Sequence, residues 1–329
     1  MTKTLPRIRR DWNGARLFVR SLQSKPKLNI PPQTQKTQRG NSFDLYVLGG
    51  KPIKTIIPVY GMGLLAERDP RLNKFTQACL EMNTRVAVPH LPGLSSFLLD
   101  RGDLEKLIDL LTHIYGQYQE TVSVIGFSAG ASIALSACSE PAIADMVSSI
   151  VVFSPLHDIR EVWQTLHRQN VGWEVDEKEL DEAIWARYVI AYRNRDRLGL
   201  SEDENTTIAE SLRRWSFNLP LETKRSFYLQ TIAPLSLSLR RDLLMENDAF
   251  DVLSPRGKLK GVQARVSILH DSSDSLVPPA HGQRILNELG NDGRHKLLVT
   301  PLLSHVTILA GRNILDALRI MNFLGELYA

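Results

Sequence analysis

The stretch around residues 122–138 constrains the fold of this 329-residue chain more than any other part of the sequence. A run rich in β-branched residues leads into Gly126-Phe127-Ser128-Ala129-Gly130, and a small, apolar, helix-compatible segment follows. This order predicts a strand, a sharp turn and a helix. A serine on such a turn presents its hydroxyl at the edge of a sheet, and glycines two residues to either side let the strand and the helix approach closely. The G-x-S-x-G pattern also arises by chance, so its meaning depends on partners elsewhere in the chain.

The remaining pattern is an alternation of strands and helices. Strands are predicted at 43–48, 53–59, 85–89, 122–126, 148–154, 264–270 and 295–300. Helices are predicted at 70–82, 103–118 with Asp103 as its cap, 131–138, 279–289 and 306–328. Such alternation is typical of an α/β protein with a mostly parallel sheet flanked by helices.

Residues 157–250 break this alternation. The segment is charged, helical in pattern and rich in aromatic residues, and it holds four of the five tryptophans. Because it is too long for a structureless loop, we predict a helical cap, or lid, inserted after the sixth strand, if 15–22 is counted as the first. An insert at this place lies above the crevice where open α/β sheets bind ligands. The predicted core is then 44–156 together with 251–329.

The first 43 residues are predicted to be a basic arm and linker. Residues 1–40 contain ten Lys or Arg and one acidic residue, a charge of +9, so the rest of the chain carries 30 minus 35, or −5. Most of the arm reads as irregular, but 15–22 fits either a first strand or, capped by Asp11, a short amphipathic helix.

The basic arm bears on the choice of partners. A solvated tail is the favoured interpretation, and peripheral contact with anionic lipid is the alternative. Only Trp12 and Phe18 accompany the basic residues, which is too few for a platform that stacks bases, so we expect no nucleic-acid binding. The sequence does not predict an oligomeric state.

Composition excludes several other classes. No run approaches the roughly 18 apolar residues of a membrane span, and the first residues lack a signal-peptide segment, so we expect a cytoplasmic protein, with membrane-surface association as an option. Cys79 and Cys138 are expected to be buried thiols. No H-E-x-x-H, paired C-x-x-C or G-x-x-x-x-G-K motif is present, so neither a metal nor a cofactor is expected.

Ser128 would need a histidine to take its proton and an acid to orient that histidine. The loop after strand 264–270 offers Asp271 and Asp274, and the loop after 295–300 offers His305. These follow in the order Ser, Asp, His that accompanies a G-x-S-x-G turn.

With this G-x-S-x-G turn, the chain resembles the α/β-hydrolase family over residues 44–156 and 251–329. Four further pieces match in order: Tyr60-Gly61-Met62-Gly63 is similar to the oxyanion loop H-G-x-G, 86–96 to V-x-x-P-D-x-x-G-x-G-x-S, 269–278 to H-G-x-x-D-x-x-V-P, and His305 to the histidine before the last helix. The resemblance implies Ser128 as nucleophile, Asp274 as acid and His305 as base, with the backbone amides of Met62 and Ala129 as oxyanion donors.

Three positions depart from the family pattern. Tyr60 stands where histidine is usual, His90 where aspartate is usual and Asp271 where glycine is usual. Asp271 leaves two aspartates in one loop, and we favour Asp274 because Asp271 ends the strand and suits a turn-capping role. Asp158 is a third, weaker candidate for the acid.

The expected function is that of a serine hydrolase with a small-molecule substrate. It would cleave a carboxylic ester or thioester, with a hydrophobic acyl group, through an acyl-enzyme intermediate. An acyltransferase using the same residues and a non-catalytic, hydrolase-like binding protein are the alternatives.

Overall fold

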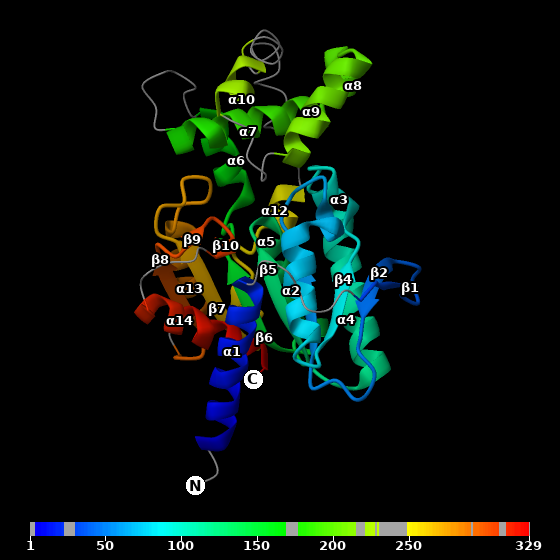
Figure 1. The fold of residues 1–329 in the computed structure, drawn as a ribbon, viewed down its shortest axis with the longest axis vertical. Coiled ribbons are helices and arrows are strands. Elements are labelled where there is room, and N and C mark those ends of the chain that lie inside the picture. Colours follow the sequence, from blue (N-terminus) through cyan, green and yellow to red (C-terminus); the bar gives the residue numbers. More distant parts are fainter. Residues whose placement is uncertain are drawn as a thin grey trace.

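A central sheet of eight strands organises the computed structural model, which describes residues 4–22, 30–168, 177–214, 221–227, 229, 249–290, 292–308 and 314–328 (Figure 1). The strands are β1 (Gln33–Lys36), β2 (Ser42–Tyr46), β3 (Thr55–Val59), β4 (Arg85–Pro89), β5 (Val122–Phe127), β6 (Val147–Phe153), β7 (Arg265–Asp271) and β8 (Lys296–Thr300). Their order is β1-β2-β4-β3-β5-β6-β7-β8. All neighbours from β4 to β8 pair in parallel, whereas β1 and β2 are antiparallel additions at one edge. The predicted mostly parallel α/β sheet is confirmed.

Two groups of helices flank the sheet. The helices are α1 (Thr4–Leu22), α2 (Pro70–Leu80), α3 (Pro92–Ser95), α4 (Arg101–Tyr118), α5 (Ala129–Cys138), α12 (Ala249–Leu253), α13 (Ala280–Leu289) and α14 (Ile314–Gly325). Helices α4, α5 and α12 contact one another, while α1 contacts α2 and α14. Cys79 in α2 and Cys138 in α5 are free, buried thiols, as predicted. Among the described helices, none combines the length and apolar character needed to cross a membrane.

The strand order reverses at β3. The chain passes from β3 to β4 on one side and then crosses to β5 on the other, so the ends of β3 and β5 lie side by side, with Val59 opposite Gly126. Open α/β sheets bind their ligands at such a switch point, outside the carboxyl ends of the strands. The topology therefore brings the loop of residues 60–63 next to Ser128.

The described parts of the chain between β6 and β7 are mainly helical. It forms α6 (Ile159–Arg168), α7 (Glu177–Arg193), α8 (Arg195–Leu198), α9 (Glu202–Arg214) and α10 (Leu221–Phe227). Helix α7 packs against α6, α9 and α10, and this group lies beyond the end of the sheet (Figure 1). Its interior contains the fully buried side chains of Ile184, Tyr188 and Ile208. Trp173 and Trp215 lie outside the described residues.

The amino-terminal segment differs from the prediction of a mostly irregular arm. Helix α1 covers residues 4–22, and residues 33–36, predicted as linker, form β1. Of the two alternatives for 15–22, the helix is therefore correct, and it begins well before Asp11. Leu17 and Phe18 are buried on its inner side, so packing against α14 and α2 stabilises a helix that local sequence only weakly favours.

Gly14 marks the point where α1 crosses α14. A β-carbon on Gly14 would lie 1.9 Å from the carbonyl oxygen of Met321 and 2.6 Å from the nitrogen of Gly325. Only a residue without a side chain permits this approach, which explains a glycine inside a helix despite its low helix propensity.

Replacing Gly14 by alanine is expected to lower the free energy of unfolding by about 1–3 kcal/mol, because the two helices must separate. The matched control is Gly116→Ala in α4, where a β-carbon would meet no atom within 4 Å. That change should stabilise the protein by up to about 1 kcal/mol, through helix propensity alone. Urea denaturation of both variants measures the difference, and equal effects would contradict the close crossing.

Two further boundaries differ from the prediction. Helix α4 begins at Arg101, and its cap is Asp100, whose side chain accepts a hydrogen bond from the Gly102 amide at 2.9 Å. The last helix begins at Ile314 rather than at 306, because a short hairpin of β9 (Leu303–Ser304) and β10 (Thr307–Ile308) precedes it. An apolar run can form either strand or helix, and here the hairpin holds residue 305 in its turn.

Candidate active site

Ser128 occupies a strained turn between β5 and α5. Its backbone has φ 52° and ψ −126°, a conformation that residues with a side chain rarely adopt. A β-carbon on Gly126 would lie 2.5 Å from the Ala131 α-carbon, and one on Gly130 would lie 2.0 Å from the Tyr60 carbonyl oxygen. The two glycines therefore let α5 pack directly against the ends of β5 and β3, as the G-x-S-x-G pattern predicts.

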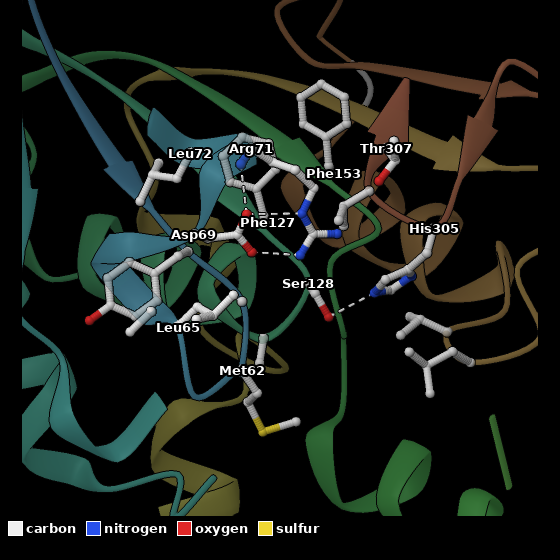
Figure 2. Close-up of a pocket in the computed structure, with 18 of the residues that line it drawn as sticks. Met62, Leu65, Asp69, Arg71, Leu72, Phe127, Ser128, Phe153, His305 and Thr307 are labelled. Atoms are coloured by element: carbon white, nitrogen blue, oxygen red, sulfur yellow. Dashed lines mark hydrogen bonds and ion pairs between the residues drawn. The ribbon is translucent and has the colours of Figure 1, made fainter. Parts of the chain in front are cut away.

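A continuous chain of hydrogen bonds links Ser128, His305 and Asp274. His305 Nε2 lies 3.0 Å from Ser128 Oγ, and His305 Nδ1 lies 2.7 Å from Asp274 Oδ2. Figure 2 shows His305 pointing toward Ser128, with Met62 beside it. Three residues from the ends of different strands are thus brought to the same edge of the sheet. The arrangement has the geometry of a nucleophile, a base and an orienting acid.

Asp274 is buried and ionised. Burial by itself would raise the pKa of Asp274, but the charge and hydrogen bond of His305 and the Val277 amide, 2.9 Å from Oδ1, lower that pKa to about 2. The carboxylate therefore stays negative through the neutral and mildly acidic range. A negative charge at Nδ1 fixes the tautomer of His305 that leaves Nε2 free to accept a proton.

The other two aspartates occupy different positions. Asp271 Oδ1 accepts a hydrogen bond from the Ser273 amide at 2.8 Å, and Oδ2 accepts one from the His305 backbone amide at 3.1 Å. Asp271 thus closes the turn after β7 and holds the backbone of His305. Asp158 pairs with Arg256 at 2.7 Å. Of the three candidates for the acid, only Asp274 hydrogen-bonds the ring of His305 within the described residues.

A cavity of about 710 Å³ opens from Ser128 and His305. Its walls are mainly apolar and come from both the sheet and the helices after β6; they include Phe97, Phe127, Phe153, Leu156, Ile159, Val162, Trp163, Trp185 and Leu212. The ion pair of Asp69 and Arg71, 2.6 Å apart, lines another part of it (Figure 2). The cavity therefore has a reactive centre with room for an apolar group.

Solved structures with the same architecture identify the fold. An esterase of Pyrococcus furiosus matches with a TM-score of 0.53 at 15% identity, covering 92% of this chain and 95% of the esterase. The acylaminoacyl peptidase of Pyrococcus horikoshii matches with a TM-score of 0.51 at 11% identity over 90% of this chain. This chain has the α/β-hydrolase fold. It spans 40% of the length of that peptidase. No protein-family model and no curated protein matches the sequence.

Two residues whose backbone amides are unpaired among the described residues line the same cavity as Ser128. Met62, in the loop after β3, and Ala129, the first residue of α5, both line the cavity. Neither amide donates a hydrogen bond to another described residue. Ala129 also lies at the amino-terminal, electropositive end of α5. Both amides are therefore available to a negatively charged oxygen, the role that the family resemblance implies for them.

A second layer of hydrogen bonds braces the loop that carries Met62. The Tyr60 hydroxyl accepts a hydrogen bond from the Leu91 amide at 2.7 Å, and the Gly63 amide donates to the Leu94 carbonyl at 3.2 Å. Asp103, in turn, accepts hydrogen bonds from the amides of Gly93 and Leu94 at 3.1 and 2.7 Å. Tyr60, a departure from the family pattern, thus ties the loop to residues 91–94.

The fully buried Asp103 gives this brace a pH dependence. Burial raises the pKa of Asp103 to about 6, although the amides of Gly93 and Leu94 oppose the rise. An exposed aspartate has a pKa of about 3.9, so the folded state binds the proton more tightly. The stabilisation from this group is present at low pH and is lost as the pH rises through 6.

Between about pH 4 and pH 7, the free energy of unfolding of the wild-type protein should fall by about 2–3 kcal/mol more than that of Asp103→Asn. The variant has no carboxyl group at this position to titrate. Urea denaturation at a series of pH values measures this difference. Parallel stability curves for the two proteins would show that Asp103 does not titrate in this range.

Ser154 is a residue of the site that sequence reasoning missed. It follows β6, is buried and has φ 44°. Its hydroxyl donates a hydrogen bond to the His305 carbonyl at 2.9 Å and interacts with Asp274. Ser154 therefore supports both partners of Ser128. The available signal was its place at the carboxyl end of the strand beside β5, where site residues gather.

Among the described side chains, no group of three or more His, Cys, Asp or Glu is arranged to hold a metal ion.

Proposed function

We propose that the protein is a serine hydrolase that cleaves a carboxylic ester or thioester. The observation that carries this proposal is the chain from Ser128 Oγ through His305 to the buried Asp274, with contacts of 3.0 and 2.7 Å, at the floor of a cavity. A serine hydroxyl is a weak nucleophile at neutral pH and becomes effective when an adjacent imidazole accepts its proton.

In the acylation step, Ser128 Oγ attacks the carbonyl carbon of the substrate while His305 Nε2 takes the hydroxyl proton. The carbonyl oxygen becomes an oxyanion, which the amides of Met62 and Ala129 would stabilise; each such donor is worth about 3 kcal/mol in comparable enzymes. When the tetrahedral intermediate collapses, the bond to the leaving oxygen or sulfur breaks. The leaving group takes the proton from His305, and the acyl group remains on Ser128.

Deacylation repeats these steps with water. His305 takes a proton from the water as its oxygen attacks the acyl carbon, and the proton then passes to Ser128 Oγ as the acid leaves. Asp274 remains ionised throughout, consistent with its pKa of about 2, and stabilises the imidazolium in both steps.

The walls of the cavity favour a hydrophobic acyl group. Phe127 and Phe153 stack at 5.3 Å between ring centroids beside Ser128, and Trp163 and Trp185 close the cavity from the helices after β6. We propose that residues 157–250 act as the lid of this site. Burial of an acyl chain against such walls contributes roughly 0.8 kcal/mol per methylene group.

A fluorophosphonate probe tests the proposal, because it phosphonylates only an activated serine. Labelling of the wild-type protein at Ser128, and none in Ser128→Ala, is expected. A wild-type protein that stays unlabelled would instead point to a hydrolase-like binding protein.

A second experiment addresses the acyltransferase alternative. Turnover of a short-chain aryl ester in water, without an added acceptor, is the expected result for a hydrolase. If the product forms only when an alcohol or amine is supplied, then the lid excludes water and the protein is a transferase.

A further inference from the structure

Exposed apolar side chains gather on two helices at one side of the molecule. The described residues contain nine large apolar side chains that are exposed, and five of these belong to α1 and α14: Trp12, Val19, Ile314, Leu315 and Leu318. Each exposes more than half of its surface, with 65% for Trp12 and 74% for Ile314. We call these five residues the α1–α14 face. Apolar surface gathered in this way marks a site of interaction.

The spacing of these residues shows that they form outward faces. Trp12 and Val19 are seven residues apart, two helical turns, and so lie on the same side of α1, opposite the buried Leu17 and Phe18. The three residues of α14 likewise span one turn. Helices α1 and α14 cross at Gly14 and lie in the lower half of the view in Figure 1, whereas the helices after β6 lie at its top. Helix α1 is therefore apolar on its outer as well as its inner side.

Charge identifies the occupant of this face. The sequence of α1 contains five arginines and one aspartate, and residues 1–40 as a whole carry a charge of +9. Arg20 pairs with Glu81 at 2.8 Å, which leaves four arginines of α1 for contact with headgroups. A basic helix with an exposed apolar side is suited to the surface of an anionic bilayer, where arginines meet headgroups and apolar side chains enter the acyl boundary. A second copy of the chain would bring two basic helices together, which charge repulsion opposes.

We propose that the α1–α14 face docks the protein on an anionic membrane surface. Ser21, at the end of α1, and Leu324, in α14, both line the cavity that contains Ser128. Docking through these helices places one side of the cavity close to the bilayer, from which an acyl ester could enter. The docking itself depends on neither Ser128 nor its chemistry.

Sedimentation of the full-length protein with lipid vesicles tests the proposal. Vesicles that contain phosphatidylglycerol are expected to bind the protein at least about tenfold more tightly than vesicles of phosphatidylcholine alone. Binding should weaken as salt rises, because salt screens the attraction between arginines and headgroups. Ser128→Ala should bind as the wild type does, so that failure of docking and failure of the hydrolase proposal are separate outcomes.

Paired substitutions locate the contact. Trp12→Ser combined with Leu315→Ser should weaken binding to phosphatidylglycerol vesicles by about tenfold or more, because two apolar side chains no longer enter the bilayer. Ile53→Ser is the matched control: Ile53 is also apolar and 43% exposed, but it lies outside α1 and α14. Circular dichroism and the unfolding midpoint verify that each variant is folded.

Three results would overturn the proposal. They are equal or absent binding to the two kinds of vesicle, a double variant that binds as tightly as the wild type, and an Ile53→Ser variant that loses binding to the same extent. A dimer without lipid that Trp12→Ser dissociates would assign the α1–α14 face to a second copy of the chain.

Discussion

Replacing Ser128 by alanine is expected to lower kcat for an aryl ester by on the order of 10⁶-fold, to the level left by binding and the oxyanion donors. The same loss is expected for His305→Ala, because the Ser128 hydroxyl is an effective nucleophile only when His305 accepts its proton across the 3.0 Å contact. The variant with both substitutions should be no worse than either single one. Steady-state kinetics with highly purified protein measures all three.

The control for this experiment is stability. Alanine keeps the β-carbon of serine, so the strain at φ 52° is unchanged and the unfolding midpoint should stay close to that of the wild type. Losses that multiply in the double variant would mean that Ser128 and His305 act independently, contrary to the proposed mechanism.

Asp274→Asn is expected to lower kcat by about 10⁴-fold with little change in KM. An amide at this position carries no charge to stabilise the imidazolium, and it favours the wrong tautomer of His305. Asp274 is fully buried behind His305 and does not line the cavity, so substrate binding should persist. Measurements of kcat and KM separate these two effects.

Asp271→Asn is the matched control, since the same chemical change is made in the same loop. Asp271 contacts the backbone of His305 rather than its ring, so we expect a loss of no more than about tenfold, through positioning alone. If Asp271→Asn were as damaging as Asp274→Asn, the acid would have to be reassigned.

The parts of the fold that sequence predicts are those that local pattern encodes. The β-branched runs that become β3, β5 and β6 are continuous and apolar because both faces of a parallel sheet are covered. The turn at Ser128 needs glycines at two fixed offsets, which is a signal within five residues. Since the ends of parallel strands meet at one edge, the same pattern also indicated that Asp274 and His305 would lie near Ser128.

The parts that sequence did not predict depend on contacts between distant segments. Helix α1 is stabilised by α14, some 300 residues away, and Gly14 looks unfavourable until the crossing is seen. Asp103 suited the start of a helix, but its carboxylate instead holds the amides of residues 93 and 94. Ser154 belongs to no motif, and only its place at the carboxyl end of β6 pointed to the site, because its partners His305 and Asp274 follow other strands.

The contact between α1 and α14 has a consequence for the synthesis of the chain. Because α1 and α14 are some 300 residues apart in the sequence, α1 leaves the ribosome about 15–60 s before α14 does, at about 5–20 residues per second. Until α14 is made, Leu17 and Phe18 have only α2, the other helix that packs against α1, to cover them. The inner side of α1 is therefore buried completely only late in folding, after α14 has been made.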